Sequence, residues 1–198
     1  MKSFNPPACL RNQEPILSVF KQCMNDKLTH LFEMGSGTGQ HACYIAPFFP
    51  NLTWYTSDKP SAHPMIEAAL QQAKLSNIKA PLSYEVGKDD LPAEQMEAVF
   101  SANTFHILSW EHVCLFIEQA SKKLRIGGLF IVYGPFMRDG EYASENDQAF
   151  DAYLSNENPV SALRGLDDVT VEMKKAHCRL QKVFDMPANN LTLLFEKI

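Results

Sequence analysis

The sequence predicts an α/β protein in which helices cover both faces of a mostly parallel sheet. Short apolar runs, rich in β-branched and aromatic residues, alternate along the chain with amphipathic segments of helical period. Apolar strands that alternate with helices indicate a parallel sheet buried on both faces. A glycine-rich turn, Gly35-Ser36-Gly37-Thr38-Gly39, directly follows the first apolar run. Such a turn between a strand and a helix is typical of Rossmann-like folds.

Length and composition bound the class of protein. With 198 residues, of which 45% are hydrophobic and 21% charged, we expect a single domain over residues 1–198. The net charge of −5 and the lack of a Lys/Arg stripe argue against an extended nucleic acid as partner. The N-terminus has no apolar signal-peptide core and no run approaches membrane-spanning length. We therefore expect a cytoplasmic protein with a small-molecule substrate and no membrane partner.

The five cysteines are scattered and include no C-x-x-C pair. Their odd number and spacing argue against a disulfide framework and against a structural zinc site. We interpret them as small buried apolar residues in a reducing compartment. The six histidines are also spread along the chain, so no metal site is expected.

The chain begins with three prolines within residues 5–16, which predict an extended start followed by a helix. One face of that helix is apolar and carries Ile16, Leu17, Phe20 and Met24. Ahead of it stands a polar cluster of Arg11, Asn12 and Glu14, which is either a solvated cap or a lid over a ligand crevice. We expect residues 1–27 to form an N-terminal lid and helix.

Five apolar runs predict the parallel strands. They span residues 28–34, 52–57, 82–86, 97–106 (the last part a loop) and 129–133. The helices expected between them span residues 41–49, 62–75 and 110–124, the last of them stopped by Gly127-Gly128. Residues 137–166, polar and partly helical, form an expected insertion that covers the active site. A helix at 167–176 and two strands, 179–185 and 191–198, joined by a hairpin, complete the chain.

The glycine turn has the spacing G-x-G-x-G. A dinucleotide-binding loop would read G-x-G-x-x-G, but Gln40 stands where its third glycine would be. Glu33, two residues before the first glycine, is expected to point a negative charge into the same crevice. That charge suits an ammonium or sulfonium group better than two phosphates. The alternative is a structural strand-to-helix turn without a ligand.

Acidic residues follow the next two strands. Asp58 ends the second strand, 19 residues after Gly39, where an acid accepts hydrogen bonds from ribose hydroxyls in folds of this kind. Glu85 and Asp89 follow the third strand, and the sequence does not choose between them as the adenine contact. A turn or helix-capping role explains Asp58 and Asp89 as well.

The carboxyl ends of parallel strands meet at one edge of a sheet, where ligands bind. The ends predicted here carry the glycine loop, Asp58, and residues 85–89, 103–106 and 134–136. The hairpin with Asn189 and Asn190 reaches the same edge if the sixth strand is parallel to the others. Those two asparagines either hydrogen-bond a substrate or tolerate the left-handed dihedrals of a turn.

Several stretches, read together, resemble one family over almost the whole chain. They are Asn5-Pro6-Pro7-Ala8, Glu33-Met34-Gly35-Ser36-Gly37-Thr38-Gly39-Gln40-His41, Ala102-Asn103, Tyr133-Gly134-Pro135-Phe136 and Met186-Pro187-Ala188-Asn189-Asn190-Leu191. The family is one of class I S-adenosylmethionine (SAM) methyltransferases, described as a domain of unknown function and, in animals, as methyltransferase-like proteins. The chain departs from its pattern between Leu154 and Leu166. Members usually carry an arginine- and tryptophan-containing stretch there, whereas this chain has Ser155-Asn156-Glu157-Asn158-Pro159-Val160-Ser161.

The resemblance implies a seven-stranded Rossmann-like sheet with an antiparallel last strand, SAM as cofactor and S-adenosylhomocysteine (SAH) as product. The cofactor-binding residues that it implies are Glu33, Gly35, Ser36, Gly37, Gly39, His41, Asp58, Glu85 and Asn103. The expected substrate-binding residues are Arg11, Asn12, Tyr133, Asn189 and Asn190.

Methyl transfer requires an aligned nucleophile and an acceptor for any proton that it carries. Asn103 is expected near the transferring methyl group. His106 is the candidate general base, because the unperturbed pKa of histidine lies near neutrality. A loop histidine hydrogen-bonded for structure is the alternative.

The sequence leaves several functions open. The main hypothesis is a methyltransferase for a small molecule of unknown identity. A methyltransferase for a protein or RNA, and a SAM-binding protein without catalytic activity, are the alternatives. A nicotinamide oxidoreductase is disfavoured by the G-x-G-x-G spacing. The sequence does not give the oligomeric state.

Overall fold

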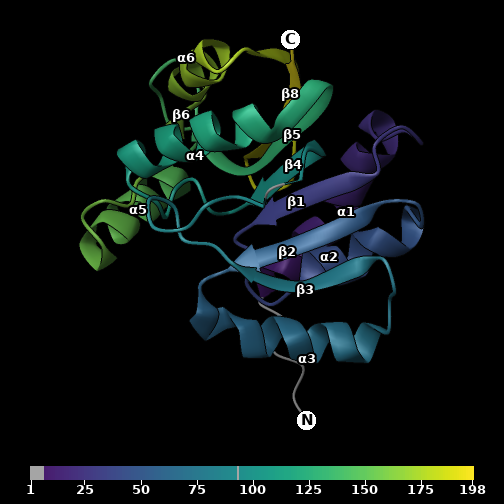
Figure 1. Cartoon of the computed structure of the whole chain (residues 1–198). Helices are drawn as coiled ribbons and strands as arrows, with labels where there is room; N and C mark the ends of the chain where they lie inside the picture. The colour runs from purple at the N-terminus through teal and green to yellow at the C-terminus, as the bar shows by residue number, and fades with distance from the viewer. Residues whose placement is uncertain (1–6, 93) are drawn as a thin grey trace.

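A seven-stranded sheet forms the centre of the computed structural model, which describes residues 7–92 and 94–198 (Figure 1). Its strands are β1 (His30–Met34), β2 (Thr53–Asp58), β3 (Ile78–Ser83), β4 (Met96–Ala102), β5 (Leu124–Met137), β7 (Cys178–Asp185) and β8 (Asn190–Lys197). They lie in the order β3-β2-β1-β4-β5-β8-β7, and the two-residue strand β6 (Arg164–Gly165) pairs with β5. Strands β1 to β5 are parallel, whereas β8 is antiparallel to both β5 and β7. The expected seven-stranded sheet with an antiparallel last strand is confirmed.

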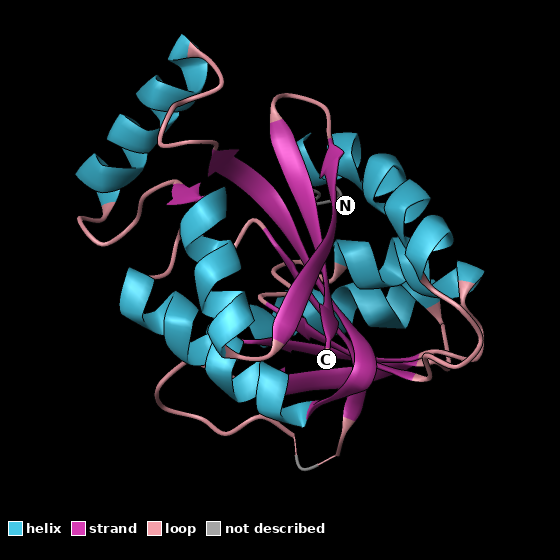
Figure 2. Cartoon of the chain, turned by 90° about the horizontal axis from the view of Figure 1, so that it is seen from above, coloured by secondary structure: helices cyan, strands magenta, loops and turns pink. Residues whose placement is uncertain are grey.

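Helices flank both faces of the sheet (Figure 2). They are α1 (Pro7–Cys23), α2 (Gln40–Ile45), α3 (His63–Ala73), α4 (Trp110–Lys123), α5 (Glu145–Glu157) and α6 (Leu166–Lys175), with short 3₁₀ turns at Ala46–Phe48 and Pro60–Ala62. α1 and α2 share one buried cluster with the sheet, and α4 and α6 share another on the opposite face. α5 lies beyond the edge toward which the arrowheads of β1 and β2 point (Figure 1).

Aromatic packing places α1 against the sheet. Phe20 stacks on Trp54 of β2 with ring centroids 5.7 Å apart and meets Phe100 of β4 edge-on at 5.1 Å. All three side chains are fully buried. Large buried aromatic side chains contribute strongly to a core, so these contacts fix the first helix over β1 and its neighbours.

The predicted extended start is wrong for the described residues, because α1 begins at Pro7 and contains Pro15. Proline suits the first helical position, where its missing N–H has no partner to lose. Pro15 removes one helical hydrogen bond, and the complete burial of Ile16 and Leu17 directly after it offsets that loss. Asn5 and Pro6 lie outside the described residues.

Two strands differ most from their expected bounds. β3 spans Ile78–Ser83 instead of residues 82–86, so both its start and its end lie earlier in the chain than expected. It is an edge strand, and an edge tolerates Pro81 because the outer side needs no donor. β5 begins at Leu124, before the glycines expected to precede it, and continues through Pro135, which pairs with Asn190 of β8. The neighbouring strands, not the local apolar run, therefore set the length of β5.

A buried carboxylate ties together the amino ends of three strands. Glu97, 6% exposed at the start of β4, accepts bonds at Oε2 from the backbone and hydroxyl of Thr29 and from the backbone N–H of His30, at 2.8–3.3 Å. Its Oε1 pairs with Arg125 of β5 at 2.8 Å. Burial alone would raise the pKa of Glu97, but the bond from Thr29 and the charge of Arg125 outweigh it and hold the pKa below its ordinary value.

Glu97→Gln should lower the free energy of unfolding by about 2 kcal/mol at pH 7, because it removes charge-assisted bonds at a buried site. The stability that this carboxylate contributes is present above its unfolded pKa and is lost as the pH falls through the lower folded value. The deficit of the variant should therefore shrink in acid. Urea unfolding at several pH values measures it, and Arg125→Met, which removes only the ion pair, should cost less. A deficit that does not change with pH would contradict this account.

Candidate functional site

The carboxyl ends of the first five strands meet at one edge, as the sequence predicts. The backbone N–H of Gly37, after β1, donates to Asp58 Oδ2 at the end of β2 at 2.8 Å. The backbone carbonyl of the same Asp58 accepts the N–H of Tyr84, which follows β3, at 3.2 Å. On the other side, the N–H of Asn103, after β4, donates to the carbonyl of Tyr133 in β5 at 2.8 Å. Direct bonds therefore link the loops of neighbouring strands.

The first position of the loop requires glycine for two reasons, its backbone conformation and its close packing. Gly35 has a positive φ of 73°, a conformation that glycine adopts without steric cost. A Cβ atom on Gly35 would lie 2.5 Å from Oγ1 of Thr104, in the loop after β4. The loops that follow β1 and β4 are thus in direct contact here, which the sequence did not reveal.

Asp58 holds the glycine loop in place. Its Oδ2 accepts the bond from Gly37, and its Oδ1 accepts the backbone N–H of Lys59 at 2.8 Å. A carboxylate offers about four lone-pair sites, so acceptor capacity is left for a ligand. The expected position of this acid at the tip of β2 is confirmed, and a ribose contact stays a prediction.

Glu33 lies deeper than expected. Its side chain is 1% exposed, and its Oε2 accepts bonds from Trp54 Nε1 and from the hydroxyl of Ser36, both at 2.9 Å. Burial raises the pKa of Glu33 to about 7, against the opposing effect of the two hydrogen bonds. The expected fixed negative charge pointing into an open crevice is therefore replaced by a buried carboxyl that is only partly ionised at neutral pH.

Side chains of α1 bind directly to α2, the helix that follows the glycine loop. His41 Nε2 donates to Oδ1 of Asn12 at 2.9 Å, and Gln40 Nε2 donates to Oε1 of Gln13 at 2.6 Å. A third pair joins the Tyr44 hydroxyl to Glu14 at 2.5 Å. The polar cluster predicted as a cap or a lid therefore packs α1 against α2, whereas Arg11 is exposed. Periodicity did not reveal these pairs, because their partners lie about thirty residues apart in the chain.

Two of the expected residues are thus buried in this helix contact. Asn12 and His41 are 4% and 6% exposed, and burial lowers the pKa of His41 to about 4, so its ring is neutral at pH 7. Gln40 is 7% exposed, and its Oε1 accepts no hydrogen bond from the described part of the chain. A buried acceptor without a donor is uncommon in proteins, and this one lies directly beside the glycine loop.

The loop after β4 brings Asn103 and His106 together. Asn103 has a left-handed φ of 54°, which asparagine tolerates better than most residues. A Cβ atom on Gly134 of β5 would lie 3.7 Å from Nδ1 of His106 and 3.9 Å from Oδ1 of Asn103. Phe150 of α5 covers the histidine edge-on at 5.7 Å between ring centroids.

The ordinary pKa expected for His106 is wrong. The side chain is 6% exposed, and burial, together with the nearby positive charge of Arg164, lowers the pKa to about 4. The imidazole is therefore neutral over most of the physiological range and is able to accept a proton, although as a weak base. The role of general base stays a prediction.

The acids after β3 are both engaged in a local turn. Asp89 Oδ2 accepts the backbone N–H of Glu85 at 2.9 Å. Glu85 pairs with Lys88 at 2.8 Å, and this partner lowers the pKa of the Glu85 carboxyl. The geometry does not favour either acid as the adenine contact.

The remaining expected residues lie at β5 and at the β7–β8 hairpin. Tyr133 is 3% exposed and packs in the cluster shared with α1. Asn189 Nδ2 bonds Ser144 Oγ and Asp147 Oδ2 at the start of α5, both at 3.2 Å. Asn190 Nδ2 bonds the carbonyl oxygens of Pro187 and Ala188 within its own turn. Asn189 therefore joins the hairpin to α5.

A cavity of about 420 Å³ lies between this hairpin and the end of β5. Phe136, Tyr142, Met186, Asn189 and Asn190 are among its lining residues, and Arg138 and Asp185, which form an ion pair, line it as well. Its volume falls within the range of small-molecule sites. It holds the two asparagines of the expected substrate set.

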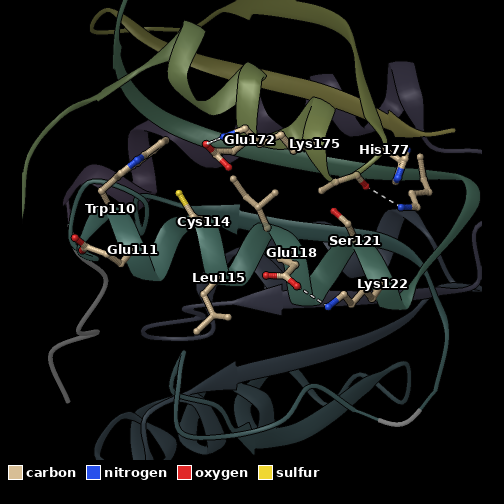
Figure 3. Close-up of a pocket in the computed structure, with 13 residues that line it drawn as sticks. Trp110, Glu111, Cys114, Leu115, Glu118, Ser121, Lys122, Glu172, Lys175 and His177 are labelled. Atoms are coloured by element: carbon tan, nitrogen blue, oxygen red, sulfur yellow. Dashed lines mark hydrogen bonds and ion pairs between the residues drawn. The ribbon is translucent and has the colours of Figure 1, made fainter.

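A larger hollow of about 750 Å³ lies elsewhere, between α4 and α6 (Figure 3). Trp110 and Cys114 of α4 line it on one side and Glu172 and Lys175 of α6 on the other. None of the residues expected at the ligand edge lines it. No group of three or more metal-binding side chains lies together among the described residues. In the same described part, no helix has the length and apolar character needed to cross a bilayer.

The fold is that of the class I methyltransferases. An O-methyltransferase family protein from Burkholderia thailandensis matches with a TM-score of 0.81 at 13% identity, over 96% of this chain and 57% of that one. Human N-acetylserotonin methyltransferase, solved in complex with SAM, matches with 0.80 at 16% identity, over 96% and 52%. PigF with SAH matches with 0.78 at 16% identity, over 96% and 64%. The chain thus spans between 52% and 64% of the length of these proteins.

The chain belongs to the family described as proteins of unknown function (DUF938), whose model matches residues 2–197. Membership confirms the resemblance that the sequence motifs carry.

Glu33→Gln should change how stability depends on pH. The raised pKa means that the stabilisation by the protonated carboxyl is fully present below pH 4.5 and is lost as the pH rises through about 7. The variant cannot ionise, so its free energy of unfolding relative to the natural protein should rise by about 2–3 kcal/mol between pH 5 and pH 8. Urea unfolding across this range measures the difference. Glu118→Gln, on the exposed face of α4, is the control and should show a nearly constant difference.

Proposed function

We propose that this protein is a SAM-dependent methyltransferase that acts on a small molecule. The observation that carries the proposal is the contact between the glycine loop, Asp58 and the Asn103–His106 loop at the ligand edge of a class I methyltransferase fold. Relatives of the same fold include one solved with SAM and one solved with SAH. Their identity to this chain is low, so the assignment of cofactor and activity rests on its own residues.

The residues at the edge fit SAM. A Cβ atom on Gly37 would meet nothing within 4 Å, so a ligand is able to approach the backbone of the loop closely. Asp58 has spare acceptor capacity for ribose hydroxyls. Gln40 Oε1, without a partner among the described residues, and the partly ionised Glu33 suit the ammonium end of the cofactor. Glu85 or Asp89 is the proposed adenine contact.

When bound, SAM supplies an electrophilic methyl group. The protein has to align the acceptor behind that methyl, exclude water and take up any proton that the acceptor loses. Asn103, held by its left-handed backbone and its bond to Tyr133, is the proposed contact near the methyl group. His106, whose lowered pKa of about 4 leaves the ring neutral at physiological pH, is the proposed proton acceptor at Nδ1 or Nε2.

The acceptor is proposed to enter through the cavity beside the hairpin. Residues 137–166, which include α5, extend beyond the ligand edge and border that cavity, so we propose that they cover the active site. A cavity of about 420 Å³ has the size of a small-molecule site, so we propose a small molecule rather than a protein or an RNA as the acceptor. We propose a reducing cytoplasm as the compartment, because the five cysteines are scattered along the sequence without a C-x-x-C pair.

Calorimetric titration with SAM, SAH and NAD tests the cofactor. SAM and SAH should bind, and Asp58→Ala should weaken both by at least about tenfold, because a charge-assisted bond to the ribose is lost. Asp26→Ala, on an exposed turn before β1, is the matched control and should bind as the natural protein does. If NAD binds and neither SAM nor SAH binds, the proposal is refuted.

Labelled methyl transfer into a cell extract tests the acceptor class. The label should appear in the small-molecule fraction. Label in protein or RNA would favour the macromolecular alternative, and tight SAM binding without transfer into any fraction would favour a protein that binds SAM without turnover.

His106→Asn should lower the rate of transfer to the identified acceptor by about a hundredfold or more, while SAH binding changes little, if His106 is the base. With a pKa of about 4, the rate of the natural enzyme should fall only as the pH drops through about 4, not near 6.5. His177→Asn, at an exposed turn after α6, should leave the rate unchanged. An acidic limb near pH 6.5, or full activity of His106→Asn, would assign the proton to another group.

A further inference from the structure

The loop that carries Asn103 and His106 is held by its backbone carbonyl groups. Four consecutive carbonyls, those of residues 105–108, each accept a hydrogen bond from the segment of residues 161–164. Arg164 Nε donates to the Phe105 carbonyl at 3.1 Å, and its Nη2 donates to that of Leu108. Between them, the N–H of Ala162 donates to His106 at 3.0 Å and the hydroxyl of Ser161 donates to Ile107 at 2.8 Å. We call this arrangement the carbonyl clamp.

The segment that supplies the donors is itself fixed on both sides. Asp151 of α5 accepts the backbone N–H of Leu163 at 2.5 Å, and the hydroxyl of Ser155 donates to the Ser161 carbonyl at 3.3 Å. On the other side, Arg164 pairs with Phe136 as part of β6 against β5. The clamp therefore transmits the position of α5 and β5 to the loop after β4.

The chemistry of the donors suits this role. Ser161 and Leu163 are 2% and 3% exposed and Arg164 is half-buried, so water competes poorly for these bonds. A guanidinium presents donors in a rigid planar fork, whereas a lysine ammonium is a single point. With one side chain, Arg164 thus binds the carbonyls of Phe105 and Leu108 in the loop. The same side chain also binds the carbonyl of Val160 at 2.9 Å.

We infer that Arg164, together with Ser161, positions the Asn103–His106 loop for binding and methyl transfer. The inference rests on the proposed function, since it concerns the same site. Arg164 bonds only backbone carbonyls in this contact, so it is a positioning residue and not a catalytic one. The consequence is that a side chain of the insertion, about sixty residues after Asn103, controls the geometry of the reaction centre.

The first test measures the order of the loop without any ligand. Amide hydrogen exchange of residues 103–109 should become about tenfold faster in Arg164→Ala and less so in Arg164→Lys and Ser161→Ala, because each removes part of the clamp. Exchange in β1 and β2 should not change. Arg179→Ala in β7, which breaks an ion pair with Glu196 of β8, is the control and should leave the loop unaffected.

The second test measures SAH affinity by calorimetry at a temperature where every variant is folded. Kd should rise about tenfold in Arg164→Ala and by a smaller factor in Arg164→Lys and Ser161→Ala. Millimolar guanidinium should restore the affinity of Arg164→Ala but not that of Ser161→Ala, which a general loss of stability would not produce. If Arg164→Ala fails to fold, the lysine and serine variants carry both tests.

The outcomes separate the two proposals. Loop exchange or SAH affinity that stays at the natural level in the folded Arg164 variants would overturn the clamp. If the natural protein binds no SAH, the proposed function fails, and hydrogen exchange alone then decides whether the clamp orders the loop.

Discussion

The close approach of Gly35 to Thr104 is the constraint on which the ligand edge depends. A Cβ atom at Gly35 would come within 2.5 Å of the threonine hydroxyl, closer than any real side chain tolerates, so only glycine lets the loops after β1 and β4 touch. The parallel pairing of β1 between β2 and β4 then brings Asp58 to the other side of the same loop. Because Gly35 has no Cβ atom, the loops after β1 and β4 are able to contact each other and form one site.

Two buried carboxylates at opposite ends of the sheet illustrate how surroundings decide charge. Glu97 has donors on both oxygens and a guanidinium beside it, and these lower its pKa. Glu33 has two neutral donors and no cation, so burial dominates and raises its pKa to about 7. A buried carboxylate that serves the structure costs less free energy when hydrogen-bond donors and a cation satisfy its oxygens. An incompletely neutralised one, as at Glu33, is typical of a site where a ligand completes the arrangement.

Local sequence pattern was sufficient for the sheet and for the part of the site next to the glycines. Apolar runs located the strands except β3, which spans Ile78–Ser83 and shares only residues 82 and 83 with the run expected for it. Spacing located Asp58, and both signals are short-range. The start of α1 was mispredicted because burial of Ile16 and Leu17 outweighs the prolines. The pKa of His106 depends on burial and on the charge of Arg164, which lies far along the chain, and the bonds of Arg164 go to backbone carbonyls. No side-chain pattern encodes contacts of either kind, so the sequence could not show them.

The titration behaviour of Glu33 has a thermodynamic consequence for any cation that docks beside it. Because its pKa is raised to about 7, the carboxyl is only partly ionised at neutral pH, and a nearby positive charge draws it toward the ionised form. Docking is then coupled to release of part of a proton into the medium. The apparent heat of association would accordingly depend on the ionisation enthalpy of the buffer, so two buffers at the same pH would give different enthalpies for one and the same equilibrium.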